Sequence, residues 1–248
     1  MKQPSGALSP AIRSHLEELP LVRRSILQTV SRFAASLPAG ATVLDAGAGD
    51  APYAELFAHC DYMTADWPNS VHSGARKADI VASLESLPVS AERFDAVVCT
   101  EVLEHVARPE AVLSELHRVL APAGRLCLTV PFVWPLHEEP HDFFRYTNHS
   151  VAQMLDRAGF VQVEVEPRGG YLSTLGQVAA MSRWLHSGET EGIRGIQVRL
   201  SLSLARACAL PLAWLAKRTP SLDAELVGVP FPLGYAALAT KPARSPTR

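Results

Sequence analysis

The sequence is short of cysteine, of net charge and of long uncharged apolar runs. Its 248 residues include 4 cysteines with no Cys-x-x-Cys pair. This number and spacing argue against a disulfide framework and against a cysteine-based zinc site. A formal net charge of −2 provides no basic field for nucleic acid. No uncharged apolar run reaches the roughly 18 to 20 residues of a membrane span. The polar first ten residues do not resemble a secretory signal, so we expect reduced thiols and a cytoplasmic location.

The chain does have enough apolar residues for a sizeable core. With 48% hydrophobic and 19% charged residues, its composition is typical of a folded α/β protein and not of a disordered chain. We expect one domain over residues 1–248, with a helical segment over residues 1–37. About sixty residues, 171–231, separate the last two predicted strands, where a compact domain would use a short connection. We therefore expect a helical insertion or cap there.

Helix-like and strand-like segments alternate along the chain. The spacing of apolar residues predicts helices over residues 11–36 (with a break at Pro20), 52–60, 109–120 and 151–160. Apolar or alternating stretches predict strands over residues 41–47, 61–66, 77–83, 94–101, 125–131, 161–167 and 233–241. This alternation indicates a doubly wound, mostly parallel α/β sheet. Ligands of such sheets bind beyond the carboxyl ends of the strands.

A glycine-rich turn follows the first predicted strand, in the stretch VLDAGAGDAP. Gly47 and Gly49 allow a ligand to approach the backbone, and the helix predicted after them offers its N-terminus. Asp66 ends the next predicted strand, where an acid can accept both hydroxyls of a ribose. Together the turn and the acid predict a nucleoside site.

The acids of this turn favour a cationic ligand over a dinucleotide. A dinucleotide site would need a third glycine, and the carboxylate of Asp50 would repel a pyrophosphate. Asp45 and Asp50 suit S-adenosylmethionine (SAM), which carries an ammonium and a sulfonium group and no phosphate. The alternative for Asp45 is that it only holds the turn in place.

Several motifs, in order, resemble those of class I SAM-dependent methyltransferases of the type 11 kind. VLDAGAGDAPY is similar to the family's first motif, and FDAVVCTEVLEHVARPEAVLSELHRVLAPAGRL is similar to the stretch around its fourth and fifth strands. TVPFVWPLHEEPHDFFRYT resembles a segment of a bacterial subset of the family. The likeness covers residues 40–167 and the last strand. It departs from the family pattern at Ala51, Ser83 and Ala123.

The resemblance implies a Rossmann-like seven-stranded fold and SAM as the cofactor. The residues that it places around SAM are Asp45, Gly47, Gly49, Asp66, Ser83, Leu84, Cys99 and Thr100. Asp45 and the two glycines would contact the amino-acid part of SAM, and Asp66 would hold the ribose. Ser83 and Leu84 would lie beside the adenine.

Titratable and aromatic side chains follow the fourth and fifth predicted strands. The candidate bases for an acceptor that must lose a proton are His141, His105 and His137. The candidate acceptor-binding residues are Phe143, Arg145 and Tyr146. Each of these residues also has a purely structural alternative. His105 would only stabilise its loop, and the aromatic rings of Phe143 and Tyr146 would pack beneath the loop that carries them. Arg145 would form an ion pair with Glu138 or Glu139. A metal on His137, His141 and Asp142 has plausible ligand types, but no spacing rule supports it, and we predict no metal.

These features predict a SAM-dependent methyltransferase that acts on a small-molecule or lipid-like acceptor. The available histidines favour methylation at oxygen. The alternatives are SAM-assisted cyclisation or a nicotinamide oxidoreductase on the same fold, or a silent SAM-binding partner. The pattern of residues 199–218 predicts a mostly apolar helix with basic ends. Three roles are open for this helix: it caps the substrate pocket, packs on a homodimer partner, or touches a membrane surface. We expect no nucleic-acid partner.

Overall fold

The computed structural model describes residues 20–72, 74–181 and 231–244, together with scattered positions between 203 and 219. The expectations for residues 1–19 lie outside the described residues, as do those for most of the predicted insertion beyond residue 181.

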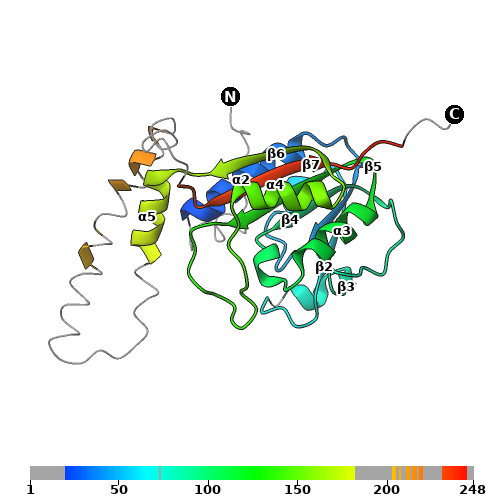
Figure 1. Cartoon of the computed structure of the whole chain (residues 1–248), viewed down its shortest axis with the longest axis horizontal. Helices are drawn as coiled ribbons and strands as arrows, with labels where there is room; N and C mark the ends of the chain where they lie inside the picture. Colours follow the sequence, from blue (N-terminus) through cyan, green and yellow to red (C-terminus); the bar gives the residue numbers. More distant parts are fainter. Residues whose placement is uncertain are drawn as a thin grey trace.

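Seven strands form one mixed sheet in the order β3-β2-β1-β4-β5-β7-β6 (Figure 1). The strands are β1 (Thr42–Ala46), β2 (Asp61–Asp66), β3 (Ile80–Val81), β4 (Phe94–Thr100), β5 (Leu120–Pro131), β6 (Val161–Arg168) and β7 (Gly234–Thr240). Strands β1 to β5 pair in parallel, and β7 runs antiparallel between β5 and β6. The predicted α/β fold with a mostly parallel seven-stranded sheet is confirmed.

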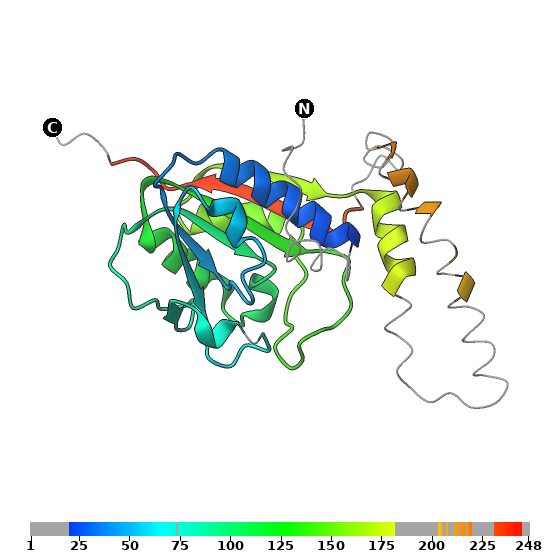
Figure 2. The same cartoon turned by 180° about the vertical axis from the view of Figure 1, so that it is seen from behind.

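Helices cover both faces of this sheet. The α-helices whose bounds the structure describes are α2 (Pro20–Ala35), α3 (Pro109–Val119), α4 (Asn148–Arg157) and α5 (Tyr171–Met181). The 3₁₀ turns are η1 (Ala54–Phe57), η2 (Ala75–Lys77) and η3 (Leu103–His105). Helices α3 and α4 lie on the face seen in Figure 1, and α2 crosses the opposite face, which Figure 2 shows.

The central strands are buried on both sides. Val97 and Cys99 of β4 join the core beneath α3 and α4, whereas Ala96 and Val98 join the core beneath α2. Because both faces are covered, β4 shows a nearly continuous apolar run in place of an alternating one. Ligand access is therefore confined to the strand ends and their loops.

Three elements differ from the sequence-based prediction. The helix expected over residues 52–60 is only the 3₁₀ turn η1, in which Phe57 alone is buried. The third strand is shortened to β3, which pairs only with β2 at the edge of the sheet. Strand β5 begins at Leu120, before the predicted turn, because Leu120 pairs with Phe94 across a register shift. Pairing with neighbouring strands sets the boundaries of β3 and β5.

Helix α4 begins three residues before its predicted start. The Thr147 hydroxyl accepts a hydrogen bond from the Ser150 backbone N–H, and the Ser150 hydroxyl accepts one from the Thr147 N–H. This reciprocal capping satisfies two backbone donors that a helix start leaves unpaired. The cap marks the end of the long loop over residues 132–147.

Helix α5 occupies the first part of the predicted cap. It contacts α2, and the Thr174 hydroxyl donates to the Phe231 carbonyl at 2.8 Å, which joins α5 to the chain just before β7. Among the described residues, no helix is long and apolar enough to cross a membrane. The capping, dimerising and membrane-contact roles of residues 171–231 stay predictions.

Truncation of a buried leucine on α3 tests the packing of the α3 face. Leu116 is fully buried, so we expect Leu116→Ala to lower the free energy of unfolding by about 2–5 kcal/mol through lost burial and the cavity it leaves. Ser114 is exposed on the same helix, and Ser114→Ala should change that free energy by less than about 0.5 kcal/mol. Urea denaturation of both variants is the measurement. Equal effects of the two substitutions would contradict the packing described here.

Candidate active site

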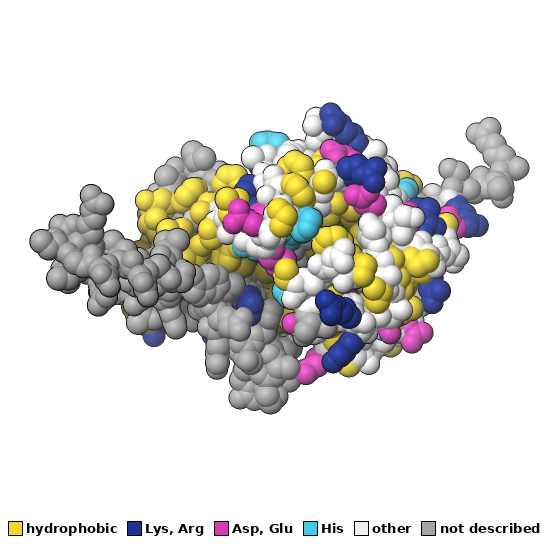
Figure 3. All heavy atoms as spheres, turned by 90° about the horizontal axis from the view of Figure 1, so that it is seen from below, with side chains coloured by type: hydrophobic (Ala, Val, Ile, Leu, Met, Phe, Trp, Pro, Cys, Tyr) yellow, Lys and Arg dark blue, Asp and Glu magenta, His cyan; other side chains and the backbone are white. Residues whose placement is uncertain are grey.

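A cavity of about 920 Å³ opens where β1, β2 and β4 end. The predicted site residues that line it are Gly47, Gly49, Asp66, Ser83, Leu84, Thr100, His105, His137, His141 and Phe143. Its other walls come from α2 and from the loops after β2 and β5. Seen from below, histidine and acidic side chains gather among hydrophobic ones on this side of the molecule (Figure 3). The volume lies within the range of about 300–1,000 Å³ that is typical of small-molecule sites.

The glycine turn needs glycine for two separate reasons. Gly47 and Gly49 have φ angles of +79° and +55°, which side-chain-bearing residues rarely adopt. A Cβ atom on Gly47 would also lie 2.4 Å from Cγ2 of Val102, which follows β4. The sequence-based interpretation assigned this space to the ligand, whereas the structure shows that Val102 also requires it. Gly47 is thus constrained by conformation and by packing.

Asp66 ties this turn to the end of β2. Its carboxylate is buried and accepts backbone N–H bonds from Gly49 and Trp67, each at 2.7 Å. A carboxylate has about four lone-pair positions, so two bonds leave acceptor capacity for other donors. The buried acid beside an open turn fits a ligand with paired hydroxyls, as the ribose of SAM has.

Two loops meet across the mouth of the cavity. The Gly74 N–H donates to the Asp50 carboxylate at 2.7 Å, which draws the loop after β2 over the glycine turn. His72 of that loop places Nε2 3.4 Å from Oε1 of Glu138, which belongs to the loop after β5. The hydrogen bond to Glu138 raises the pKa of His72. The protonated form of His72 therefore strengthens this bridge.

Asp45 is oriented differently from the expectation. It is buried, does not line the cavity, and accepts a hydrogen bond from the Tyr62 hydroxyl. Burial raises the pKa of its carboxyl from 3.8 to about 6, with the Asp66 charge as a smaller cause. Cys99 likewise lies in the core outside the cavity lining, and burial raises the pKa of its thiol. Neither geometry supports a direct contact with SAM.

Two histidines that line the cavity lie against each other. His105 and His137 have ring centroids 4.6 Å apart. His105 Nδ1 lies 2.6 Å from the backbone carbonyl oxygen of His141, and His137 Nδ1 lies 3.1 Å from Oδ2 of Asp142. Burial and the nearby His105 charge lower the pKa of His137. Both rings are thus fixed through Nδ1.

Glu104 completes this group, and sequence reasoning missed it. Its side chain is fully buried, and neither carboxylate oxygen has a hydrogen-bond partner among the described residues. Burial, with the charge of Glu101 as a second cause, raises the pKa of this carboxyl well above its usual range. The available signal was an acid directly before His105 in the otherwise apolar stretch VLEHV.

Arg145 holds the loop over residues 132–147. Its guanidinium donates to both carboxylate oxygens of Asp142, at 2.6 and 2.8 Å, and to the carbonyls of Trp134, Pro135 and Phe144. These bonds use all five of its N–H groups. Its partner is Asp142 and not Glu138 or Glu139, the alternative drawn from the sequence. No donor is left for the acceptor carboxylate or phosphate that Arg145 was expected to bind.

Tyr146 is a second anchor of the same loop. Its ring is buried outside the cavity lining, and its hydroxyl donates to the Leu103 carbonyl at 2.9 Å. The Phe143 N–H donates to the Glu104 carbonyl at 2.7 Å. The loop after β5 is thereby joined to η3, and the structure assigns Tyr146 to this junction and not to acceptor binding.

Comparison with known proteins decides the family. Residues 17–165, more than half of the chain, match the family model described as a methyltransferase domain. The chain belongs to this family. The resemblance drawn from the motifs is thereby confirmed, and SAM is the cofactor of this methyltransferase domain.

Curated relatives match only part of this methyltransferase domain. A tRNA (carboxymethyluridine(34)-5-O)-methyltransferase of Arabidopsis thaliana is 32% identical over 116 residues, which are 44% of this chain and 28% of that protein. A ubiquinone biosynthesis O-methyltransferase of Xanthomonas axonopodis pv. citri (strain 306) is 35% identical over 104 residues, which are 37% of this chain and 44% of that protein. The chain thus matches less than half the length of either relative.

The fold is also shared with solved structures. The [4+2]-cyclase SpnF superposes with a TM-score of 0.52 at 20% sequence identity, over 87% of this chain and 80% of that chain. At this identity the likeness shows the fold alone. The residues around the cavity must therefore support any statement about the reaction.

Neutralising Asp66 tests the cofactor end of the cavity. We expect Asp66→Asn to weaken SAM binding about 10- to 150-fold, because charge-assisted hydrogen bonds to the ribose are worth about 1.5–3 kcal/mol. Asp61 is exposed at the opposite end of β2, and Asp61→Asn should leave the affinity unchanged. Isothermal titration calorimetry with SAM measures both. Parental affinity in Asp66→Asn would remove Asp66 from the cofactor site.

Asp45 should make the stability of the ligand-free chain depend on pH. Because its folded-state pKa is raised to about 6, its ionised form destabilises the fold above pH 6, and this cost disappears as the pH falls toward 4. We expect Asp45→Asn, which stays neutral, to be more stable than the parent at pH 8, by up to about 3 kcal/mol. The advantage should shrink toward zero at pH 4. Denaturant titrations at several pH values test this, and a pH-independent difference would contradict it.

Proposed function

We propose that this chain catalyses transfer of the methyl group of SAM to an oxygen atom of a small acceptor with an apolar body. The supporting observation is that one cavity is lined by two different sets of residues. The glycine turn and Asp66 form one set, and His105, His137 and His141 form the other. A cofactor and an acceptor can therefore meet inside a single enclosure.

At the cofactor end, Asp66 would hold the ribose and the glycine turn would pass beneath the amino-acid part. Ser83 and Leu84 line the cavity where the adenine is expected. SAM supplies a methyl group on a sulfonium, whose leaving thioether is neutral. The chain's main contribution is then to position the acceptor, which can supply much of the rate enhancement.

His141 is the candidate base. Its ring lines the cavity and contacts Trp67 and Phe143 edge-on, at centroid distances of 5.2 and 6.2 Å. Among the described residues, none forms a hydrogen bond with its imidazole nitrogens. His105 and His137, by contrast, each have Nδ1 engaged. The His141 imidazole is thus free to take the proton of an acceptor hydroxyl, which favours oxygen as the methylated atom.

Apolar side chains near the cavity favour an acceptor with an apolar body. Val71 and Phe143 line the cavity and are 67% and 45% exposed. Leu136 and Phe144, in the same loop as Phe143, are 70% and 38% exposed. Exposed apolar groups on a cavity wall and on the loop that contributes to it are typical of a ligand-binding surface. They support a hydrophobic or lipid-like small molecule.

A tRNA acceptor, which the name of one relative raises, fits the cavity less well. Among the described residues, the acids that line it are Asp50, Asp66, Glu85, Glu101 and Glu138, and the basic side chain that lines it besides the histidines is Arg23. A polyanion would be repelled by this set. The net charge of −2 also disfavours binding of tRNA.

Methyl transfer can be tested with SAM that carries a labelled methyl group. We expect label to appear on hydroxylated aromatic compounds that bear an alkyl tail, and not on tRNA or on amine analogues. His141→Ala should lower this rate by about 10²- to 10⁴-fold with little change in SAM affinity, because general base catalysis is lost. His59→Ala, which removes an exposed histidine outside the cavity, is the control.

Three outcomes would contradict the proposal. Bound SAM without transfer to any acceptor would favour cyclisation or a silent partner. Labelled tRNA would overturn the small-molecule acceptor, and a parental rate in His141→Ala would overturn the base.

A further inference from the structure

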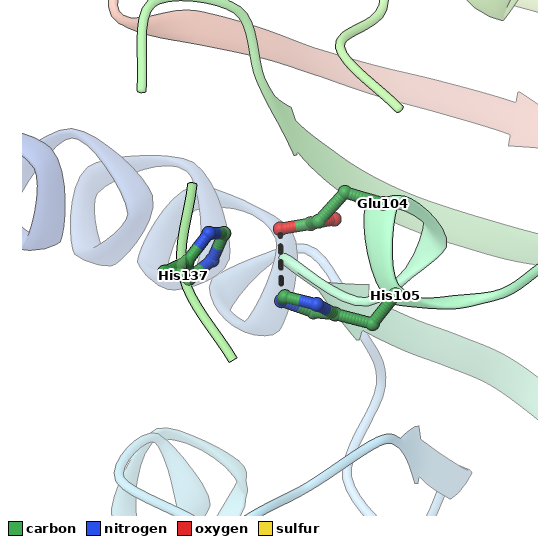
Figure 4. Close-up of side chains that lie close together, drawn as sticks. All are labelled: Glu104, His105 and His137. Carbon is green, nitrogen blue, oxygen red and sulfur yellow. Dashed lines mark ion pairs between the residues drawn. The ribbon is translucent and has the colours of Figure 1, made fainter. Parts of the chain in front are cut away.

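We infer that Glu104, His105 and His137 form a binding site for a divalent transition-metal cation of the zinc class. One ligand atom from each of these residues can be chosen so that all three lie within 4.8 Å of one another. Glu104 and His105 come from η3, and His137 comes from the loop after β5 (Figure 4). This group is assembled only when the two segments meet at the cavity.

The donor set is suited to such an ion. One carboxylate and two imidazoles are ligands typical of zinc sites that keep an open position for water or substrate. His105 Nε2 already lies 3.8 Å from Oε1 of Glu104. Ligand atoms of a tetrahedral zinc ion lie about 3.4 Å apart, because each bond is about 2.0–2.1 Å long. Small side-chain rotations would therefore close the site.

The orientation of both imidazoles is a first independent observation. Metal-bound histidines characteristically donate their other ring N–H to a carboxylate or a backbone carbonyl. His105 directs Nδ1 to the carbonyl of His141 at 2.6 Å, and His137 directs Nδ1 to the carboxylate of Asp142 at 3.1 Å. In both rings Nε2 is then the nitrogen left for a cation. Arg145 in turn fixes Asp142 through both carboxylate oxygens.

The Glu104 carboxylate is a second independent observation. It is fully buried, both oxygens are without hydrogen-bond partners among the described residues, and it points toward the gap between the two rings (Figure 4). A buried carboxylate without partners is costly to keep. A cation bound at this point would satisfy it. The sequence-based set of His137, His141 and Asp142 differs, because Asp142 is occupied by Arg145.

The place of this site suggests its use. His105 and His137 line the cavity beside His141, so a cation held there could polarise an acceptor hydroxyl. This role rests on the proposed function, whereas cation binding itself does not.

The test uses the full chain, freed of metal by dialysis against a chelator, and ZnCl₂ as the probe. Calorimetry should show one equivalent of Zn²⁺ bound, and Glu104→Gln and His137→Gln should each weaken it by at least about tenfold. His149→Gln, which removes an exposed histidine on α4, should bind like the parent. Co²⁺ added in place of Zn²⁺ should give visible absorption bands that change in both site variants. Circular dichroism verifies that each variant is folded.

The outcomes separate this inference from the proposed function. No Zn²⁺ binding by the parent, or equal binding by the parent and both site variants, would overturn the metal site. Methyl transfer measured with and without Zn²⁺ tests the proposed function separately from the metal site. A chain that binds Zn²⁺ at this site but methylates no acceptor leaves the site standing and removes the proposed function. Methyl transfer by a chain that binds no Zn²⁺ leaves the proposed function standing and removes the metal site.

Discussion

The loop that carries His137 and His141 depends on one guanidinium. Arg145 uses five N–H groups to join Asp142 to three backbone carbonyls within the loop over residues 132–147. A bidentate, largely desolvated arginine–carboxylate pair has strict geometry, so this loop has a defined shape without regular secondary structure. His137 is oriented by the same carboxylate. The arginine therefore acts on the site through the residues that it positions.

A second arginine joins the sheet to the cavity. Arg168 at the end of β6 is buried, and its guanidinium donates to Glu101, Ser25 and the carbonyls of Val130 and Tyr235. Glu101 follows β4 with a φ angle of +52°, a conformation that costs energy for a residue with a side chain. The ion pair with Arg168 offsets that cost and holds the start of η3 near the sheet. Removing one partner would leave a poorly compensated charge.

Two groups of cavity residues are held in different ways. The glycine turn and Asp66 follow directly from strand ends, and the Asp66 carboxylate accepts hydrogen bonds from the backbone N–H groups of Gly49 and Trp67. By contrast, η3 and the loop after β5 meet through the contacts of Phe143 and Tyr146 with the backbone of Glu104 and Leu103. The first group is a property of the parallel sheet. The second is a property of two segments that this chain brings together.

The sequence by itself determined the sheet, the glycine turn and the position of Asp66. Hydrophobic periodicity and the order of the strands place these residues at one edge of a parallel sheet, whatever the loops do. Sequence reasoning also found the histidines, because titratable side chains after strand ends are visible in the order of residues.

Only the tertiary structure decided which way side chains point and which loops meet. Asp45 and Cys99 belong to the correct strands but lie outside the cavity lining, and Arg145 and Tyr146 anchor their loop. Glu104 became part of the site only because the loop after β5 places His137 beside η3. The contacts of Tyr146 with Leu103 and of His137 with Glu104 join residues more than thirty positions apart, and local patterns carry no information about such pairings. That is why the glycine turn and Asp66 were predictable from sequence, and the meeting of η3 with the loop after β5 was not.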